Sequence, residues 1–297
     1  MRINPDPYPD LLVAINRAKR LESQYVQQLA SGRRISTPSD DPTASALLVR
    51  NQSRQAANDE FLHNNSSVAA GLRTADATLS SAVLALQRAV TLGVQGANGT
   101  LSNENRIALA GELHGIVDQM LSLANTSFRG SYIFAGTASK NAPFVGDDTV
   151  PGGVRYDGNS TVNEVQVGET RFIAANVPGR QIFNDPSAHV FEALNELTTA
   201  MEAGDQDQIA AATGRVRAAF DHITSERVFY GNTLNQLEAE DTFLDGQTLE
   251  IKTAENDLAG ADPLEATAAL LQARLARDAA LAATGKASML SLLDFLK

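Results

Sequence analysis

The sequence predicts a mainly α-helical protein: an elongated, antiparallel rod of long coiled-coil helices with a small β-rich domain inserted between its two arms. Apolar residues repeat over long stretches with the alternating 3- and 4-residue spacing of a heptad. Helix-start signals precede these stretches. One central segment instead has short β-like runs separated by Pro and Gly turns. We expect the two ends of the chain to pair with each other and to be disordered in the isolated monomer.

The composition argues against several classes of function. The 297 residues include 24 Lys+Arg, 35 Asp+Glu and four histidines, but no cysteine. Disulfides, thiolate metal sites and a cysteine nucleophile are therefore excluded, and the histidines stand in no metal-binding or catalytic spacing. We expect no enzyme activity and no catalytic, cofactor-binding or metal-binding residue. The acidic balance, without a basic cluster, also argues against nucleic-acid binding.

The charge is concentrated in one region, and the sequence predicts no membrane insertion. Residues 184–262 hold sixteen Asp/Glu and four Lys/Arg, which is most simply the solvated face of long helices. No run of about 18 apolar residues is present. Residues 1–10 lack the apolar region of a secretory signal peptide. Taken alone, these features predict a cytoplasmic protein, although an export route that reads another signal would escape this test.

The first long helix is expected to run from about residue 42 to residue 97. Asp40 and Asp41 precede Pro42, which is a favourable arrangement for a helix start. At 1.5 Å per residue this helix would be roughly 80 Å long, too long to fold back inside one compact domain. A second helix is expected to begin after Ser102 and continue to about residue 124. The apolar row of the first helix comprises Val68, Leu72, Ala75, Leu79, Ala82, Leu86 and Ala89.

A third long helix is expected from Asp205 towards Leu258. Polar side chains occupy three positions of its row, at Arg227, Asp241 and Thr248. They either fix the register of the helix pair or mark places where the row faces another chain. The apolar members of the row are Ile209, Ala212, Val216, Ala219, Ile223, Tyr230, Leu234, Leu237, Leu244 and Ile251.

The segment between the helical arms has a different texture. Short β-like runs at 132–135, 153–156, 162–167 and 171–174 are broken by Pro-Gly-Gly and Asp-Gly-Asn turn signals. The acidic residues at 147, 148 and 157 lack the spacing of a calcium-binding loop. We therefore interpret them as turn residues.

Both ends of the chain are amphipathic. Asp262, Pro263 and Glu265 form a capping-box-like start for a C-terminal helix. These end helices either pack on the monomer's own core, or pair with each other and stay incomplete until neighbouring subunits cover them. The C-terminal row comprises Leu264, Ala268, Leu271, Leu275, Ala279, Ala282, Met289, Leu293 and Leu296, and Lys286 is its one interruption. The N-terminal row comprises Leu12, Ile15, Leu21, Tyr25, Val26 and Leu29.

Several motifs, taken in their order along the chain, carry a resemblance. They are LASGRRI at 29–35, PSDDP at 38–42, GSYIFAG at 130–136 and the ending SMLSLLDFL at 288–296. The chain resembles the flagellin-like family of bacterial flagellar axial proteins, and among these the hook–filament junction proteins (hook-associated protein three). The resemblance covers about residues 11–145 and 205–297. The motif residues singled out are Gly32, Arg33, Asp40, Asp41, Pro42, Tyr132, Phe134 and Gly136.

The resemblance implies that different segments of the chain have different roles. Five segments are expected: an N-terminal assembly and export segment at 1–40, the first arm of the rod at 41–131, a small β-rich domain at 132–185, the second arm at 186–262 and a C-terminal assembly helix at 263–297. The residues expected to form the assembly interface are Leu12, Ile15, Tyr25, Leu29, Leu264, Leu271, Leu275, Met289, Leu293 and Leu296.

The resemblance also implies a structural function without a cofactor. Such a protein would form a ring of about eleven subunits between hook-associated protein one and the flagellin filament. It would be made in the cytoplasm, bound by a flagellar export chaperone, and exported unfolded through the type III channel without a cleaved signal peptide. Its final location would be the extracellular flagellum. A filament flagellin is the nearest alternative, and a cytoplasmic coiled-coil scaffold is a second one.

Overall fold

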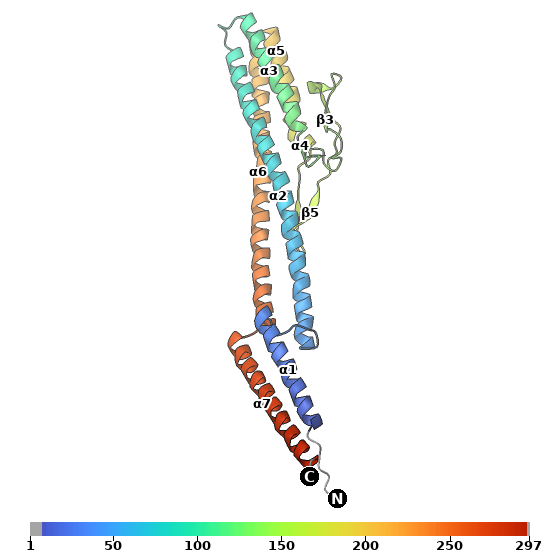
Figure 1. The fold of residues 1–297 in the computed structure, drawn as a ribbon. Helices are drawn as coiled ribbons and strands as arrows, with labels where there is room; N and C mark the ends of the chain where they lie inside the picture. The colour runs from blue at the N-terminus through green and yellow to red at the C-terminus, as the bar shows by residue number, and fades with distance from the viewer. Residues whose placement is uncertain (1–7, 296–297) are drawn as a thin grey trace. The chain divides into compact units, whose positions relative to one another are not determined.

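The computed structural model describes the backbone of residues 8–295 and the side chains of residues 9–286. Long helices dominate it, with small two-stranded sheets in the middle of the chain (Figure 1), which confirms the predicted mainly α-helical class. The chain divides into two compact units. Unit 1 comprises residues 1–57 and 246–297, and unit 2 comprises residues 58–245. The two longest helices, α2 (Pro42–Gly96) and α6 (Gln206–Ala259), contribute residues to both units.

Unit 1 contains the two end helices, α1 (Tyr8–Ser31) and α7 (Pro263–Phe295). They pack side by side and antiparallel (Figure 1), which confirms the predicted pairing of the termini. A small apolar cluster of Ile35, Ala44 and Ala259 lies in the same unit.

The core of unit 2 is built from the predicted apolar rows. Helices α3 (Asn103–Ala124) and α5 (Val190–Ala203) pack against each other, and their buried faces join those of α2 and α6 in one cluster. All the members of the α2 row are buried except Val68, which is partly buried. The α6 row from Ile209 to Tyr230 is likewise buried. The heptad spacing therefore identified the core-facing sides of both long helices.

The predicted helix starts are confirmed by capping hydrogen bonds. Asp41 accepts a hydrogen bond from a first-turn N–H group of α2 at 3.0 Å, and Ser102 does the same for α3 at 3.4 Å. Asp205 and Asp262 each accept two such bonds at the starts of α6 and α7. These side chains satisfy N–H groups that have no partner within the helix.

Polar residues in the α6 row bind partners on α2 within unit 2. Arg227 donates to both carboxylate oxygens of Asp76, at 3.0 and 3.3 Å. The Asn65 amide donates to Asp241 at 2.8 Å and to a backbone carbonyl of the β region at 3.1 Å. Of the two interpretations left open for Arg227 and Asp241, the structure favours the fixing of register within the chain.

A buried arginine closes the loop between α2 and α3. Arg106 is 5 % exposed and donates to the backbone carbonyls of Gly96 and Asn98, and to the side chain of Asn103, at 3.0 to 3.1 Å. The bond to Gly96 satisfies a carbonyl at the end of α2 that has no partner within the helix. The bond to Asn98 adds to the Leu101 N–H that this carbonyl also accepts.

The β region consists of three small antiparallel pairs. They are β1 (Ser127–Phe128) with β2 (Ser131–Tyr132), β3 (Phe144–Gly146) with β4 (Val154–Tyr156), and β5 (Glu164–Gln166) with β6 (Phe172–Ala174). A short 3-10 turn, Pro151–Gly153, precedes β4. Three of the four predicted runs contain a complete strand, and the fourth contains only the last residue of β2. Strands β1 and β3 lie outside the predicted runs.

The sequence interpretation was wrong in two places within this region. The predicted run at 132–135 ends as a strand at Tyr132, because the chain then turns to bury Phe134 in the core. A short helix, α4 (Gly179–Phe183), lies inside the segment expected to be β-rich, and its Phe183 ring contacts Phe134 and Phe144. Burial of these rings outweighs the weak local preference of so short a segment.

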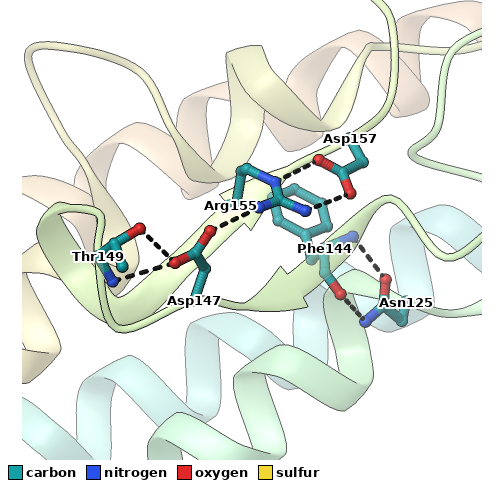
Figure 2. Close-up of polar contacts among 6 residues, drawn as sticks. All are labelled: Asn125, Phe144, Asp147, Thr149, Arg155 and Asp157. Atoms are coloured by element: carbon teal, nitrogen blue, oxygen red, sulfur yellow. Dashed lines mark hydrogen bonds and ion pairs between the residues drawn. The ribbon is translucent and has the colours of Figure 1, made fainter.

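The acidic turn residues act as interpreted. Asp147 accepts two hydrogen bonds from Thr149, and Arg155 bridges Asp147 and Asp157 across the β3–β4 hairpin (Figure 2). The bonds from Thr149, followed by the charge of Arg155, lower the pKa of the Asp147 carboxyl. Figure 2 also shows Asn125 exchanging two hydrogen bonds with the backbone of Phe144. Among the residues with described placement, no cluster of three or more His, Cys, Asp or Glu could hold a metal ion.

One helix in the described part of the chain, α2, is long and apolar enough by length and composition to cross a membrane. The sequence prediction found no such segment. The apolar side chains of α2 that form its predicted row pack into the core of unit 2, and a core helix of this kind passes the same test. The finding is therefore weak evidence for a membrane span.

Candidate assembly surface

Helix α7 carries two heptad rows on opposite faces. The inner row comprises Ala266, Leu270, Ala273, Arg277, Ala280 and Thr284, and all of its members are buried or half-buried. The outer row comprises Leu264, Ala268, Leu271, Leu275, Ala279, Ala282 and its one charged member Lys286, and all of these side chains are exposed. The row that the sequence analysis singled out on this helix is the outer one, but the row packed in the pair is the inner one.

The outer row exposes large apolar side chains to solvent. Leu264 is 82 % exposed, Leu271 is 61 % exposed and Leu275 is 72 % exposed. Complete burial of a leucine side chain is worth about 1.5–3 kcal/mol relative to leaving it in water. The outer row can therefore bind a second apolar helix face.

Helix α1 pairs with α7 through a heptad row of its own. Ile15 and Ala18 are buried, and Leu11, Glu22 and Tyr25 are half-buried at the same helical spacing. Four further large apolar side chains of α1 are exposed, and of these Leu29 continues the spacing of the paired row. They are Leu12, Val13, Val26 and Leu29.

An ion-pair cluster joins the two end helices. The carboxylate of Glu22 accepts from Arg274 Nε at 3.2 Å and from Arg277 Nη1 at 2.6 Å. Arg277 also donates two hydrogen bonds to Asp278, and these bonds, followed by the charge of Glu22, raise the pKa of the Arg277 guanidinium. Glu22 stands in the paired row of α1 and Arg277 in the inner row of α7.

The expected interface residues divide into three groups. Leu12, Leu29 and the three leucines of the outer row are exposed, whereas Ile15 and Tyr25 lie in the row that pairs with α7. Met289, Leu293 and Leu296 lie outside the side chains that the structure describes. Sequence reasoning did not single out Glu22, Arg274 or Arg277. The signal was available, since Glu22 and Arg277 each place a charge in a heptad row whose other members are uncharged.

The motifs LASGRRI and PSDDP together form the turn between α1 and α2. Gly32 has a φ of +67°, a left-handed conformation that favours glycine, directly after α1. Arg33 forms a β-bridge with Gly260. Asp40 accepts from the backbone N–H groups of residues 36 and 37, which lower the pKa of its carboxyl. With Asp41 as the cap and Pro42 as the first residue of α2, these two motifs direct the chain from α1 into α2.

The motif GSYIFAG lies in unit 2, where its residues fix the local path of the backbone. Phe134 is fully buried, and its carbonyl accepts hydrogen bonds from Gly179 N–H and the Tyr156 hydroxyl. Gly136 has a φ of +65°, and a Cβ there would meet the backbone oxygen of Asn159 at 2.4 Å. Tyr132 is half-buried in β2. The motif residues of the two units thus organise two local turns of the backbone.

Comparison with known proteins gives a consistent result. The family described as "Bacterial flagellin N-terminal helical region" matches residues 10–139. Flagellar hook-associated protein 3 of Escherichia coli is 28 % identical over 263 residues, covering 80 % of this chain and 81 % of that protein. The protein of the same name from Salmonella typhimurium is 29 % identical over 260 residues, covering 80 % of each. The crystal structure of the flagellar junction protein FlgL from Legionella pneumophila has the same fold, with a TM-score of 0.62 at 19 % identity, covering 72 % of this chain and all of that one.

Proposed function

Because this chain is a flagellin-like homologue of flagellar hook-associated protein 3, and so a structural component of the bacterial flagellum, we propose that it forms the junction between hook and filament. In this proposal the chain assembles into a ring that contacts hook-associated protein one on one side and flagellin on the other. Its relatives form a structural family, not an enzyme family. In this proposal the chain acts by binding neighbouring subunits, so its functional residues are those of its binding surfaces.

The exposed outer row of α7 is the observation that carries the proposal. α1 and α7 already pair within one chain, yet Leu264, Leu271 and Leu275 remain in solvent. We propose that a neighbouring subunit covers this row, so that assembly buries apolar surface that folding of the single chain leaves exposed. Such a contact joins different surfaces of successive copies, and a rotation that closes on itself produces a ring, of about eleven copies by family resemblance.

The route to the flagellum is part of the same proposal. An exposed apolar row in the cytoplasm would promote premature association. A flagellar export chaperone that binds residues 263–297 would cover the row until export. The chain would then leave the cell unfolded through the type III channel, without a cleaved signal peptide, and act outside the cell.

The first test changes a residue of the outer row and measures incorporation of the variant into flagella. Leu275→Asp places a charge on the proposed contact, so we expect the variant to be exported but absent from purified flagella. Gln272→Asp serves as the matched control, because it adds the same charge to an exposed position of α7 outside both rows. Incorporation would be measured by immunoblot of sheared flagella. Normal incorporation of Leu275→Asp would overturn the assignment of the outer row.

The second test separates the junction role from its alternatives. A strain lacking this chain would be examined by electron microscopy, and flagellin would be assayed in its medium. Bare hooks with flagellin released into the medium support the junction role. Absent filaments without released flagellin would instead identify the chain as the filament subunit. Normal flagella would exclude both.

A further inference from the structure

Apolar burial alone does not explain which face of α7 packs against α1. The described outer row contains three leucines, three alanines and Lys286, whereas the inner row contains one leucine, three alanines, an arginine and a threonine. Judged by apolar content alone, the outer row is the better partner for α1. In the structure α1 nevertheless packs on the inner row and leaves the leucines in solvent.

One feature of the inner row accounts for this choice. Its one charged member, Arg277, meets the one charged member of the α1 row, Glu22, at 2.6 Å, and Arg274 binds the other oxygen of the same carboxylate. Glu22 is largely shielded from water, with 18 % of its side chain exposed.

If α7 turned its outer row towards α1, Glu22 would lose Arg277 while staying within the helix pair. A half-buried carboxylate without a partner is strongly unfavourable. Polar groups placed in a heptad seam are known to select register and partner in this way. The cluster therefore opposes the pairing that apolar burial favours.

We propose that Glu22, Arg274 and Arg277 form a selector that holds the inner row of α7 against α1 and so reserves the outer row for a second copy of this chain. The inference rests on the proposed assembly function and extends it to three residues with no direct contact to the neighbour. They are positioning residues, because they act by orienting the helix that carries the contact.

A charge exchange tests the selector in the full-length chain. We expect Glu22→Arg, and separately Arg274→Glu with Arg277→Glu, to reduce incorporation into flagella by about tenfold or more, since each leaves like charges in the seam. The triple exchange, which restores opposite charges, should return incorporation to within about twofold of the unaltered chain. Glu22→Asp, which keeps the charge, should be close to normal. Arg17→Glu is the matched control, a charge reversal at an exposed position of α1 outside its paired row.

The outcomes separate the selector from the proposed function. If Glu22→Arg incorporates normally while Leu275→Asp does not, the selector is wrong and the assembly surface stands. If the triple exchange fails to recover, the three residues act in some other way, and the selector is again overturned. If Leu275→Asp itself incorporates normally, the proposed function fails first.

Discussion

The row of α2 within unit 2 and the outer row of α7 have nearly the same sequence pattern and opposite environments. Leu72, Leu79 and Leu86 are at most 1 % exposed, whereas Leu271 and Leu275 lie mostly in solvent. Both rows follow the heptad spacing. The comparison teaches that a heptad row predicts a contact face without saying whether the partner helix belongs to the same chain.

The polar members of the rows distinguish the two cases. In unit 2, Arg227 and Asp241 bind Asp76 and Asn65 across the α2–α6 contact. In unit 1, Arg277 binds Glu22 across the α1–α7 contact. The described outer row of α7 has one charged member, Lys286, and this side chain is exposed. Within this molecule, a charge in a heptad row marks a face paired inside the chain where a polar partner stands across the contact.

The largest expected effect tests this difference directly. Leu79→Ala removes a fully buried side chain and should lower the free energy of unfolding by about 2–5 kcal/mol. Leu271→Ala, the same change at an exposed position, should alter it by about 0.5 kcal/mol or less. Urea denaturation followed by circular dichroism measures both. Equal losses at the two positions would mean that the outer row is already covered within the single chain.

A smaller effect is expected at the loop between α2 and α3. Arg106→Ala leaves the Gly96 carbonyl without its buried donor and removes one of the two donors to the Asn98 carbonyl, and should cost about 2 kcal/mol of unfolding free energy. Arg73→Ala, at an exposed position of α2, is the control. The same urea titration applies. Insensitivity to Arg106→Ala would show that water replaces these bonds at little cost.

The smallest effect concerns pH and is confined to unit 2. His189 caps α5 by accepting a hydrogen bond from Glu192 N–H at 3.2 Å, and burial lowers its pKa below the usual 6.5. The unfolded chain therefore binds this proton at a higher pH than the folded chain. The free energy of unfolding should fall as the pH drops below about 6.5 and level off beneath the folded-state pKa.

The variant His189→Asn isolates this contribution. Asparagine can accept the same capping bond and does not titrate, so the difference in unfolding free energy between the two chains should change between pH 7.5 and pH 5. A constant difference across this range would contradict the proposed role of the histidine.

The sequence predicted the helical architecture well because its signals are local. Asp41, Ser102 and Asp262 are N-cap residues that indicate helix starts. The apolar rows of α2 and α6 repeat over many helical turns. It failed where long-range burial decides the outcome. Phe134 and Phe183 meet from positions far apart in the chain, and neither the turn after Tyr132 nor the helix α4 has a strong local signal.

The candidate surface was predictable in part. The leucines of the C-terminal helix were identified correctly as an apolar row, but spacing alone could not place them on the face away from α1. That choice depends on a contact between Glu22 and Arg277, 255 residues apart. A contact of this kind is invisible to local pattern, although the interruption of both rows by a charge indicates where to look.

The paired charges between α2 and α6 have a mechanical consequence. A helix pair held only by leucines and alanines can slip along its axis, because each apolar side chain finds a similar neighbour one turn away. Displacing α6 along α2 would separate Arg227 from Asp76 and Asn65 from Asp241 together, leaving these polar groups unpaired between the helices. The two pairs therefore oppose sliding of α6 along α2 and hold the two helices at a fixed axial offset.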